Sequence, residues 1–213
     1  LVARMHRPTI ITLSGKPGSG KSSTADRVAE LLGYTRYSSG DMVRQFVQQK
    51  GMPLAEFNRQ AGNDASLDQA IDEQLRALRS QKDIIIDARL GFYWIPESFK
   101  VYLDLSMDVA TARIFKDAVA NQQRETEAGQ VGTIADAQKQ VRARMNAELR
   151  RFRRIYGVDP FNPSNFDLVI NTSRHSPQTV ALTIFDTYKK WLKSDEWRPV
   201  YSAVPMGYSF ESD

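Results

Sequence analysis

The sequence predicts an α/β fold in which a parallel β-sheet of five strands lies between two layers of helices. The main evidence is that five short apolar segments alternate with stretches whose apolar residues recur at helical spacing. A second observation is the glycine-rich turn that directly follows the first of these segments. The predicted strands are residues 9–13, 34–38, 83–87, 100–105 and 167–171.

In the first half of the chain, glycine and proline indicate where helices end and begin. Residues 9–13 (TIITL) form a β-branched run typical of a buried parallel strand. The helix expected over residues 22–32 carries its apolar residues on one stripe and ends at Gly33. Beyond the second strand, Pro53 suits the first turn of a helix. The helices expected there span residues 41–49, 54–61 and 66–79.

The second half of the chain repeats the order of strand followed by helix. The runs DIIID (83–87), KVYLDL (100–105) and DLVIN (167–171) have the length and apolar centre of core strands. The polar, glycine-containing residues 121–132 have the composition of a mobile loop. Residues 197–213 show no clear period, so no element is predicted in that tail. The helices expected in this half span residues 109–120, 134–156 and 177–192.

Composition excludes several classes of protein. The chain of 213 residues has no cysteine, which excludes disulfides, zinc fingers and thiol catalysis together. Its longest apolar runs are strand-sized, and its start does not resemble a secretion signal. We therefore expect a cytoplasmic protein of one domain with no membrane partner. The net charge of +4 suits a protein that binds anions, either nucleotide phosphates or a nucleic-acid backbone.

The glycine-rich turn matches a phosphate-binding loop, or P-loop. Gly15, Gly20, Lys21 and Ser22 fit the spacing G-x-x-x-x-G-K-[ST]. The flanking strand and helix distinguish this motif from a plain glycine turn capped by serine. The backbone amides would surround phosphates, Lys21 would bind the β- and γ-phosphates, and Ser22 would be a Mg²⁺ ligand. The expected ATP-binding residues are Gly15, Lys16, Pro17, Gly18, Ser19, Gly20, Lys21, Ser22 and Ser23.

Asp87 is the second residue expected at the Mg²⁺ ion. It ends the strand DIIID, and P-loop enzymes use an acidic side chain there to hold the water shell of the metal. The alternative is a solvated strand end. The sequence has no Asn-Lys-x-Asp run, which disfavours a GTPase switch. A small-molecule kinase that uses ATP and Mg²⁺ is the better fit for one domain of this size.

Four arginines are candidates for binding the phosphate of a second substrate, because the planar guanidinium group grips phosphate at two points. Arg44 follows the second strand, and Arg89 follows Asp87. On a helical wheel of residues 134–156, Arg144 and Arg151 lie with Glu148 at the edge of the apolar stripe. The alternative for this last group is a salt-bridge set on the helix surface.

The sequence resembles the cytidylate kinase family of nucleoside monophosphate kinases, in particular its compact archaeal-type branch. The resemblance runs over about residues 10–192 and rests on GKPGSGKSS, YSSGDMVRQFVQQKGMPLAEFNRQA, IIIDARLG, RIYGVD and DLVINTSRHSP. It implies transfer of the ATP γ-phosphate to CMP or dCMP. It also implies a P-loop nucleoside monophosphate kinase domain over residues 5–193. A segment that binds the nucleoside monophosphate (about 39–81), a lid (about 116–135) and a tail (194–213) complete the expected organisation.

The resemblance also implies roles for single residues. Ser39 and Arg44 would contact the acceptor nucleotide, and Arg89 would grip its phosphate. Glu148 would help to recognise the cytosine edge, and residues 167–177 would surround the adenine of ATP. The expected acceptor-binding residues are Ser39, Arg44, Arg89, Arg144, Glu148 and Arg151. The expected catalytic residues are Lys21, Asp87, Arg89, Arg113 and Lys116, with Arg124 as a further basic candidate in the lid.

Three alternatives remain open at this stage. The first is a kinase for another acceptor, such as AMP, UMP or a small metabolite. The second is a nucleic-acid-binding or regulatory P-loop ATPase that uses the arginine-rich residues 142–154. The lack of interleaved aromatic residues disfavours it, so we do not expect a nucleic-acid partner. The third is a catalytically weakened relative with a scaffold role. We expect a monomer.

Overall fold

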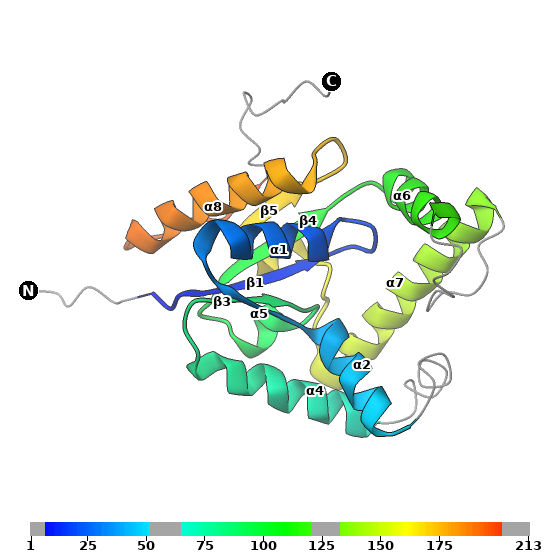
Figure 1. Ribbon diagram of the computed structural model, residues 1–213, viewed down its shortest axis with the longest axis horizontal. Coiled ribbons are helices and arrows are strands. Elements are labelled where there is room, and N and C mark those ends of the chain that lie inside the picture. The colour runs from blue at the N-terminus through cyan, green and yellow to red at the C-terminus, as the bar shows by residue number, and fades with distance from the viewer. Residues whose placement is uncertain (1–6, 52–64, 121–132, 202–213) are drawn as a thin grey trace, which may run out of the picture.

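The computed structural model describes residues 7–51, 65–120 and 133–201. Its sheet is parallel throughout, with the strand order β2-β3-β1-β4-β5-β6, and helices cover both faces (Figure 1). The strands are β1 (Ile10–Gly15), β2 (Thr35–Ser38), β3 (Ile84–Asp87), β4 (Phe99–Asp104), β5 (Leu168–Asn171) and β6 (Val200–Tyr201). The predicted three-layer α/β fold is confirmed.

The helices follow the predicted alternation closely. They are α1 (Lys21–Leu32), α2 (Ser39–Gln49), α4 (Ala65–Ala77), α5 (Gly91–Trp94), α6 (Met107–Ala120), α7 (Ile134–Tyr156) and α8 (Pro177–Lys193). Short 3-10 turns at Leu78–Ser80 and Pro163–Asn165 precede β3 and β5. The short helix α5 was not predicted, because four residues are too few to show a helical period. The expected helix over 54–61 and the loop over 121–132 lie outside the described residues.

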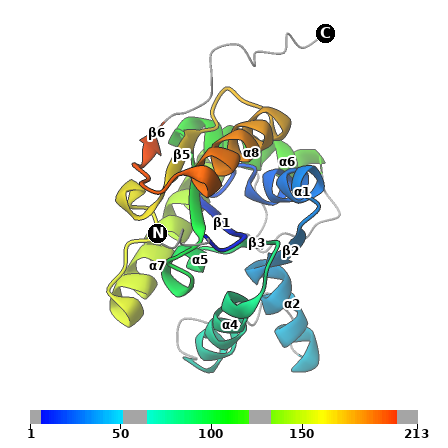
Figure 2. The same ribbon diagram turned by 90° about the vertical axis from the view of Figure 1, so that its left-hand side faces the viewer.

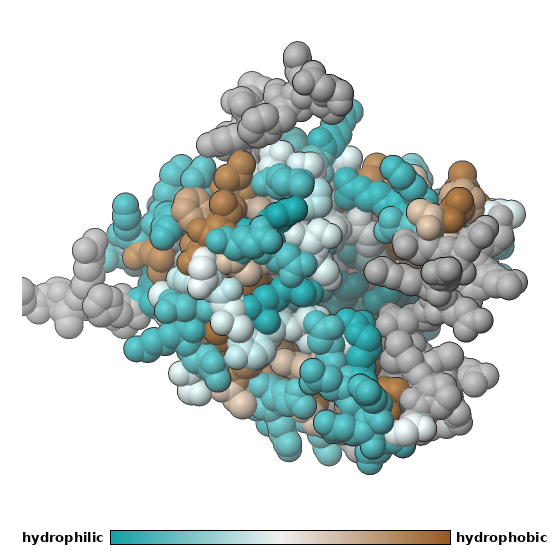
Figure 3. Space-filling view, viewed as in Figure 1, coloured by the Kyte–Doolittle hydropathy of each residue, from teal (hydrophilic) through white to brown (hydrophobic). Residues whose placement is uncertain are grey.

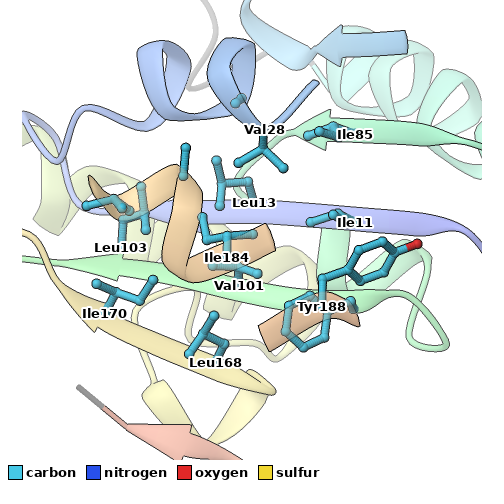
Figure 4. Packing of buried hydrophobic residues seen from close by; sticks show 14 of the residues in the cluster. Ile11, Leu13, Val28, Ile85, Val101, Leu103, Leu168, Ile170, Ile184 and Tyr188 are labelled. Carbon is cyan, nitrogen blue, oxygen red and sulfur yellow. The ribbon is translucent and has the colours of Figure 1, made fainter. Parts of the chain in front are cut away.

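One face of the sheet packs against α1 and α8. Ile11 and Leu13 of β1 point to this face and meet Val28 of α1 and Ile184 and Tyr188 of α8 (Figure 4). All of these side chains are buried to within 1% exposure. The alternating residues of β1, Ile10, Thr12 and Ser14, are buried as well, so both faces of the strand are covered. This explains why β1 contains no charged residue.

The opposite face of the sheet is covered by α4, α5 and α7. Ile84 and Ile86 of β3 pack against Leu75 of α4 and Leu78 of the 3-10 turn that follows this helix. Further along the sheet, Tyr102 of β4 lies in a cluster with aromatic residues of α5 and α7. Figure 2 shows α8 and α1 on one side of the strands and α4, α5 and α7 on the other. Because helices pack on both faces of the sheet, the ends of its central strands are held in fixed positions.

The carboxyl ends of the central strands meet at one edge of the sheet, where α2, α6 and α7 also approach (Figure 1). The strand register places Asp87 opposite both Ser38 and Leu13, and Gly15 opposite Leu103. Ligands of parallel α/β sheets bind at this edge. The polar residues that end or follow these strands therefore form the candidate site.

The predicted number of five strands is wrong, because the sheet has six. The sixth strand, β6, lies in the segment from 194 onward that the sequence left without structure. It pairs in parallel with β5, and Trp197 just before it donates a hydrogen bond from Nε1 to the carbonyl of Asp167 (3.2 Å). Two residues are too few to show the alternation that identifies a strand. A tertiary contact, invisible in the sequence pattern, creates this strand.

Within the described ranges, no helix is both long and apolar enough to cross a membrane. Hydrophilic residues predominate on the face shown in Figure 3. Four arginines of α7, Arg142, Arg150, Arg153 and Arg154, are exposed to solvent.

Candidate active site

The loop between β1 and α1 follows the sheet edge so closely that two positions require glycine. A Cβ atom on Gly15 would lie 2.6 Å from the carbonyl oxygen of Leu103. Gly18 has a φ of +76°, and its Cβ would lie 3.0 Å from the carbonyl oxygen of Ala110. Helix α1 begins at Lys21 with no side-chain cap, which leaves its first amides able to bind an anion. The loop has the geometry of a phosphate cradle.

The other predicted loop residues differ in their surroundings. The ammonium group of Lys16 forms an ion pair with Asp104 at the end of β4 (2.6 Å). Pro17 is buried, and Ser23 is exposed on α1. The hydroxyl of Ser19 is buried and has no hydrogen-bond partner in the part of the chain that the structure describes. A bound phosphate is the kind of group that would satisfy it.

The carboxylate of Asp87 is the centre of charge at the sheet edge. Asp87 is only 1% exposed and forms an ion pair with Lys21. One of its oxygens, Oδ2, accepts hydrogen bonds from Ser22 Oγ (2.9 Å) and from Arg36 Nη2 (2.9 Å). Burial and the guanidinium groups of Arg89 and Arg36 lower the pKa of Lys21. The excess of positive charge around Lys21 suits a site for a polyanion.

Ser22 and Asp87 also fit a magnesium ion. Their hydroxyl and carboxylate oxygens are hard donors, the type that Mg²⁺ prefers, and they lie in hydrogen-bond contact. Across residues 7–51, 65–120 and 133–201, no three His, Cys, Asp or Glu side chains gather as a metal cage. Mg²⁺ in phosphoryl-transfer sites takes only one or two protein ligands and completes its shell with water and phosphate. The donor set therefore suits Mg²⁺ that arrives with a nucleotide.

Arg89, Glu148 and Arg144 form a charged cluster next to the loop. Glu148 on α7 accepts hydrogen bonds from Arg89 Nε (2.7 Å) and Arg144 Nε (3.2 Å). Arg89 also donates to the carbonyl of Gly15 in the loop. Burial alone would raise the pKa of Glu148, but the positive charges and hydrogen bonds of both arginines lower it. Glu148 thus holds two guanidinium groups in place beside Lys21.

Arg151 lies apart from this cluster. The sequence grouped it with Arg144 and Glu148, but it donates to Asp68 on α4 from Nε and Nη2, with Nε 3.0 Å from Oδ2. One turn further along α4, Asp72 accepts hydrogen bonds from Trp94 Nε1 (2.9 Å) and the hydroxyl of Tyr156 (2.6 Å). These carboxylates connect α4 to α5 and to the carboxyl half of α7.

Ser39 and Arg44 both lie on α2, the helix that directly follows β2. The hydroxyl of Ser39 donates to the carbonyl of Asp87 (3.3 Å), which places the start of α2 directly beside the charged centre. Arg44 is exposed and pairs with Asp41, and this hydrogen bond lowers the pKa of Asp41. Arg44 is thus on the same helix as Ser39 but more open to solvent.

Arg113 connects the phosphate loop to the loop that follows β5. Its guanidinium group donates to the carbonyl of Gly18 (3.3 Å) and to the carbonyl of Thr172 (2.7 Å). The loop after β5 therefore lies against the phosphate loop, where the sequence placed the adenine of ATP. Lys116, one turn further along α6, is exposed. Arg124 lies outside the described residues.

Sequence analysis missed three side chains that organise this region, namely Arg36, Asp68 and Asp72. A charged residue inside a predicted strand was one available signal, since Arg36 is the second residue of β2. Asp68 and Asp72 are four residues apart on a predicted helix, so they had to share a face. Which partners they would meet could not be inferred from either signal.

The phosphate loop, the acidic strand end and the arginine cluster on a parallel α/β sheet define a P-loop phosphotransferase. The fold is similar to that of shikimate kinase from Acinetobacter baumannii, with a TM-score of 0.58 and 16% identity over 87% of this chain and 95% of that one. The sequence is 33% identical to the cytidylate kinase of Halobacterium salinarum, over 83% of this chain and 88% of the relative. It is 34% identical to that of Methanocella arvoryzae, over 83% and 94%.

The profile of the cytidylate kinase-like family matches residues 10–174. The chain belongs to the cytidylate kinase-like family, and the predicted resemblance is confirmed. It is therefore a phosphotransferase of the nucleoside monophosphate kinase type.

Proposed function

We propose that this enzyme transfers the γ-phosphate of ATP to CMP or dCMP. The observation that carries the proposal is the pair of guanidinium groups that Glu148 holds beside Lys21. A second phosphate-bearing substrate needs such groups next to the donor phosphates. The choice of cytosine follows from the relatives, which are named cytidylate kinases.

The donor side is formed by the phosphate loop and the residues around Asp87. Lys21 would exchange its ion pair with Asp87 for the β- and γ-phosphates of ATP, because a polyanion is the stronger partner for an ammonium group. Ser22 and Asp87 would hold Mg²⁺, which neutralises phosphate charge. Arg113 keeps the loop against the segment after β5 and would fix the nucleotide end of the site.

The acceptor side lies between α2, α7 and the carboxyl end of β3. Arg89 and Arg144 would bind the acceptor phosphate and hold its oxygen in line with the γ-phosphorus, since positioning supplies most of the catalysis in phosphoryl transfer. Ser39 and Arg44 would contact the nucleotide from α2. We assign residues 39–81 to acceptor binding and residues 116–135 to a lid, with Lys116 as a cation that closes over the reacting phosphate and helps to exclude water.

A coupled assay of ADP release tests the proposal. CMP, dCMP, UMP, AMP and GMP are each supplied with ATP and Mg²⁺, and initial rates are compared at equal concentration. The expected result is a clear preference for CMP, dCMP or both. A preference for AMP, UMP or GMP would identify a different acceptor. ADP release that no monophosphate accelerates would exclude a nucleoside monophosphate kinase.

A further inference from the structure

Arg36 is a charged residue of β2, the strand at one end of the sheet, and it contacts the charged centre at Asp87. It is the second residue of β2 and is 22% exposed. Its Nη2 atom lies 2.9 Å from Oδ2 of Asp87, and its Nη1 atom lies 3.1 Å from Oδ1 of Asp26 on α1. One guanidinium group thus joins the helix that follows the phosphate loop to the end of β3.

The carboxylate of Asp87 needs a cation at every stage of the reaction, because a buried charge is costly unless it is paired. Among the described residues this carboxylate has three side-chain partners, Lys21, Ser22 and Arg36. In the proposed function two of them turn to the nucleotide, Lys21 to phosphate and Ser22 to the metal. Arg36 is the one of the three with no part in holding ATP, so it can remain bonded to Asp87 throughout.

We propose that Arg36 is a positioning residue that holds the carboxylate of Asp87 in the orientation required for magnesium when Lys21 and Ser22 engage ATP. The inference rests on the proposed Mg²⁺ site but not on the identity of the acceptor base. Asp26 on α1 binds the other terminal nitrogen of the guanidinium group. Arg36 therefore holds Asp87 in a fixed orientation relative to α1, the helix that follows the phosphate loop. A fork bonded at two ends restricts rotation more than a single ammonium group can.

Two simpler roles predict different behaviour. If Arg36 only adds positive charge near the phosphates, its loss should weaken binding of metal-free ATP most, because that form is the more negative. If Arg36 only stabilises the fold, its loss should leave the effect of Mg²⁺ on ATP affinity unchanged. If Arg36 positions Asp87, its loss should instead make the gain in ATP affinity that Mg²⁺ causes smaller than in the wild type.

The test is titration calorimetry of the full chain with ATP, once with excess Mg²⁺ and once with EDTA. The ratio of the two dissociation constants (EDTA over Mg²⁺) measures the contribution of the metal. In Arg36→Met, which keeps the aliphatic stem, the ratio should fall about tenfold, the expected size for loss of one charged hydrogen bond. A folded Arg36→Met variant with the ratio of the wild type, or a larger one, would overturn the proposal.

Three further variants complete the experiment. Arg27→Met removes an exposed arginine that pairs with Glu30 on α1, so the ratio should not change. Asp87→Asn tests the metal site itself; if it keeps the wild-type ratio, the proposed Mg²⁺ arrangement fails rather than the role of Arg36. If Arg36→Met does not fold, Arg36→Lys replaces it. Lysine keeps the charge but cannot bond both carboxylates as a fork, so a reduced ratio is expected and an unchanged one counts against positioning.

Discussion

Replacing Glu148 by glutamine should impair use of the acceptor without affecting ATP. Glu148 accepts charged hydrogen bonds from Arg89 and Arg144, each of the type that contributes about 1.5–3 kcal/mol. Glutamine keeps one acceptor oxygen, so about one bond is lost. Because Glu148 is 20% exposed, solvent screening favours the lower value. A loss of about 1.5 kcal/mol corresponds to about a tenfold fall in kcat/KM for the acceptor.

The assay is steady-state ADP release with CMP varied at saturating ATP, and then with ATP varied at saturating CMP. The KM for ATP should stay within about twofold, since Glu148 contacts the arginines and not the loop amides. Glu30→Gln is the matched control, because Glu30 is exposed and forms an ion pair with Arg27 on its own helix. A folded Glu148→Gln enzyme with the acceptor kcat/KM of the wild type would refute the proposed role of this cluster.

The same variant has a signature in the pH dependence of stability. The arginines lower the pKa of Glu148 in the folded state, so the stabilisation is fully present above the unfolded pKa of about 4.3. It is lost as the pH falls through the lower folded pKa. The difference in free energy of unfolding between wild type and Glu148→Gln should therefore shrink in acid, as urea denaturation at several pH values can measure. A difference independent of pH would contradict the assignment.

Three other substitutions test the remaining parts of the site. Lys21→Ala should lower kcat about a hundredfold or more, as removal of an electrostatic catalytic group does, and near-normal turnover would remove Lys21 from the mechanism. Gly15→Ala places a Cβ 2.6 Å from the Leu103 carbonyl, so thermal unfolding should show a clear loss of stability and calorimetry a loss of ATP binding; normal values would mean that the loop can shift. A double-mutant cycle of Asp68→Asn and Arg151→Ala should give a coupling of about 1–3 kcal/mol in urea unfolding, whereas additive effects would show that the pair contributes little.

The fold could be predicted because its signals are local. The run TIITL has no charged residue because β1 is buried on both faces, and Gly15 and Gly18 of the phosphate loop have no room for a side chain. The position of Asp87 followed from the rule that parallel strands end at a common edge. Each of these features depends on a few adjacent residues, so the pattern alone carries them.

The pairing of charges could not be predicted in the same way. Helical spacing placed Arg144, Glu148 and Arg151 on one side of α7, but the partners of Glu148 and Arg151 come from the turn after β3 and from α4. Glu148 accepts a hydrogen bond from Arg89, and Arg151 donates one to Asp68, because the tertiary fold brings these charged groups close together. Arg36 was overlooked for the same reason, since its partners lie 10 residues before it and 51 residues after it in the sequence.

The strand β6 has a consequence for the behaviour of the protein in solution. Without it, β5 would be the last strand of the sheet and would offer its row of unpaired backbone groups to any other extended chain. Val200 and Tyr201 occupy that row, and Trp197 packs its ring against Phe99 over the same edge. With only two residues, β6 is itself too short to pair stably with a strand of another chain. We therefore expect that shortening the chain to end with α8 would leave the residues of the candidate site in place but make the protein prone to aggregate.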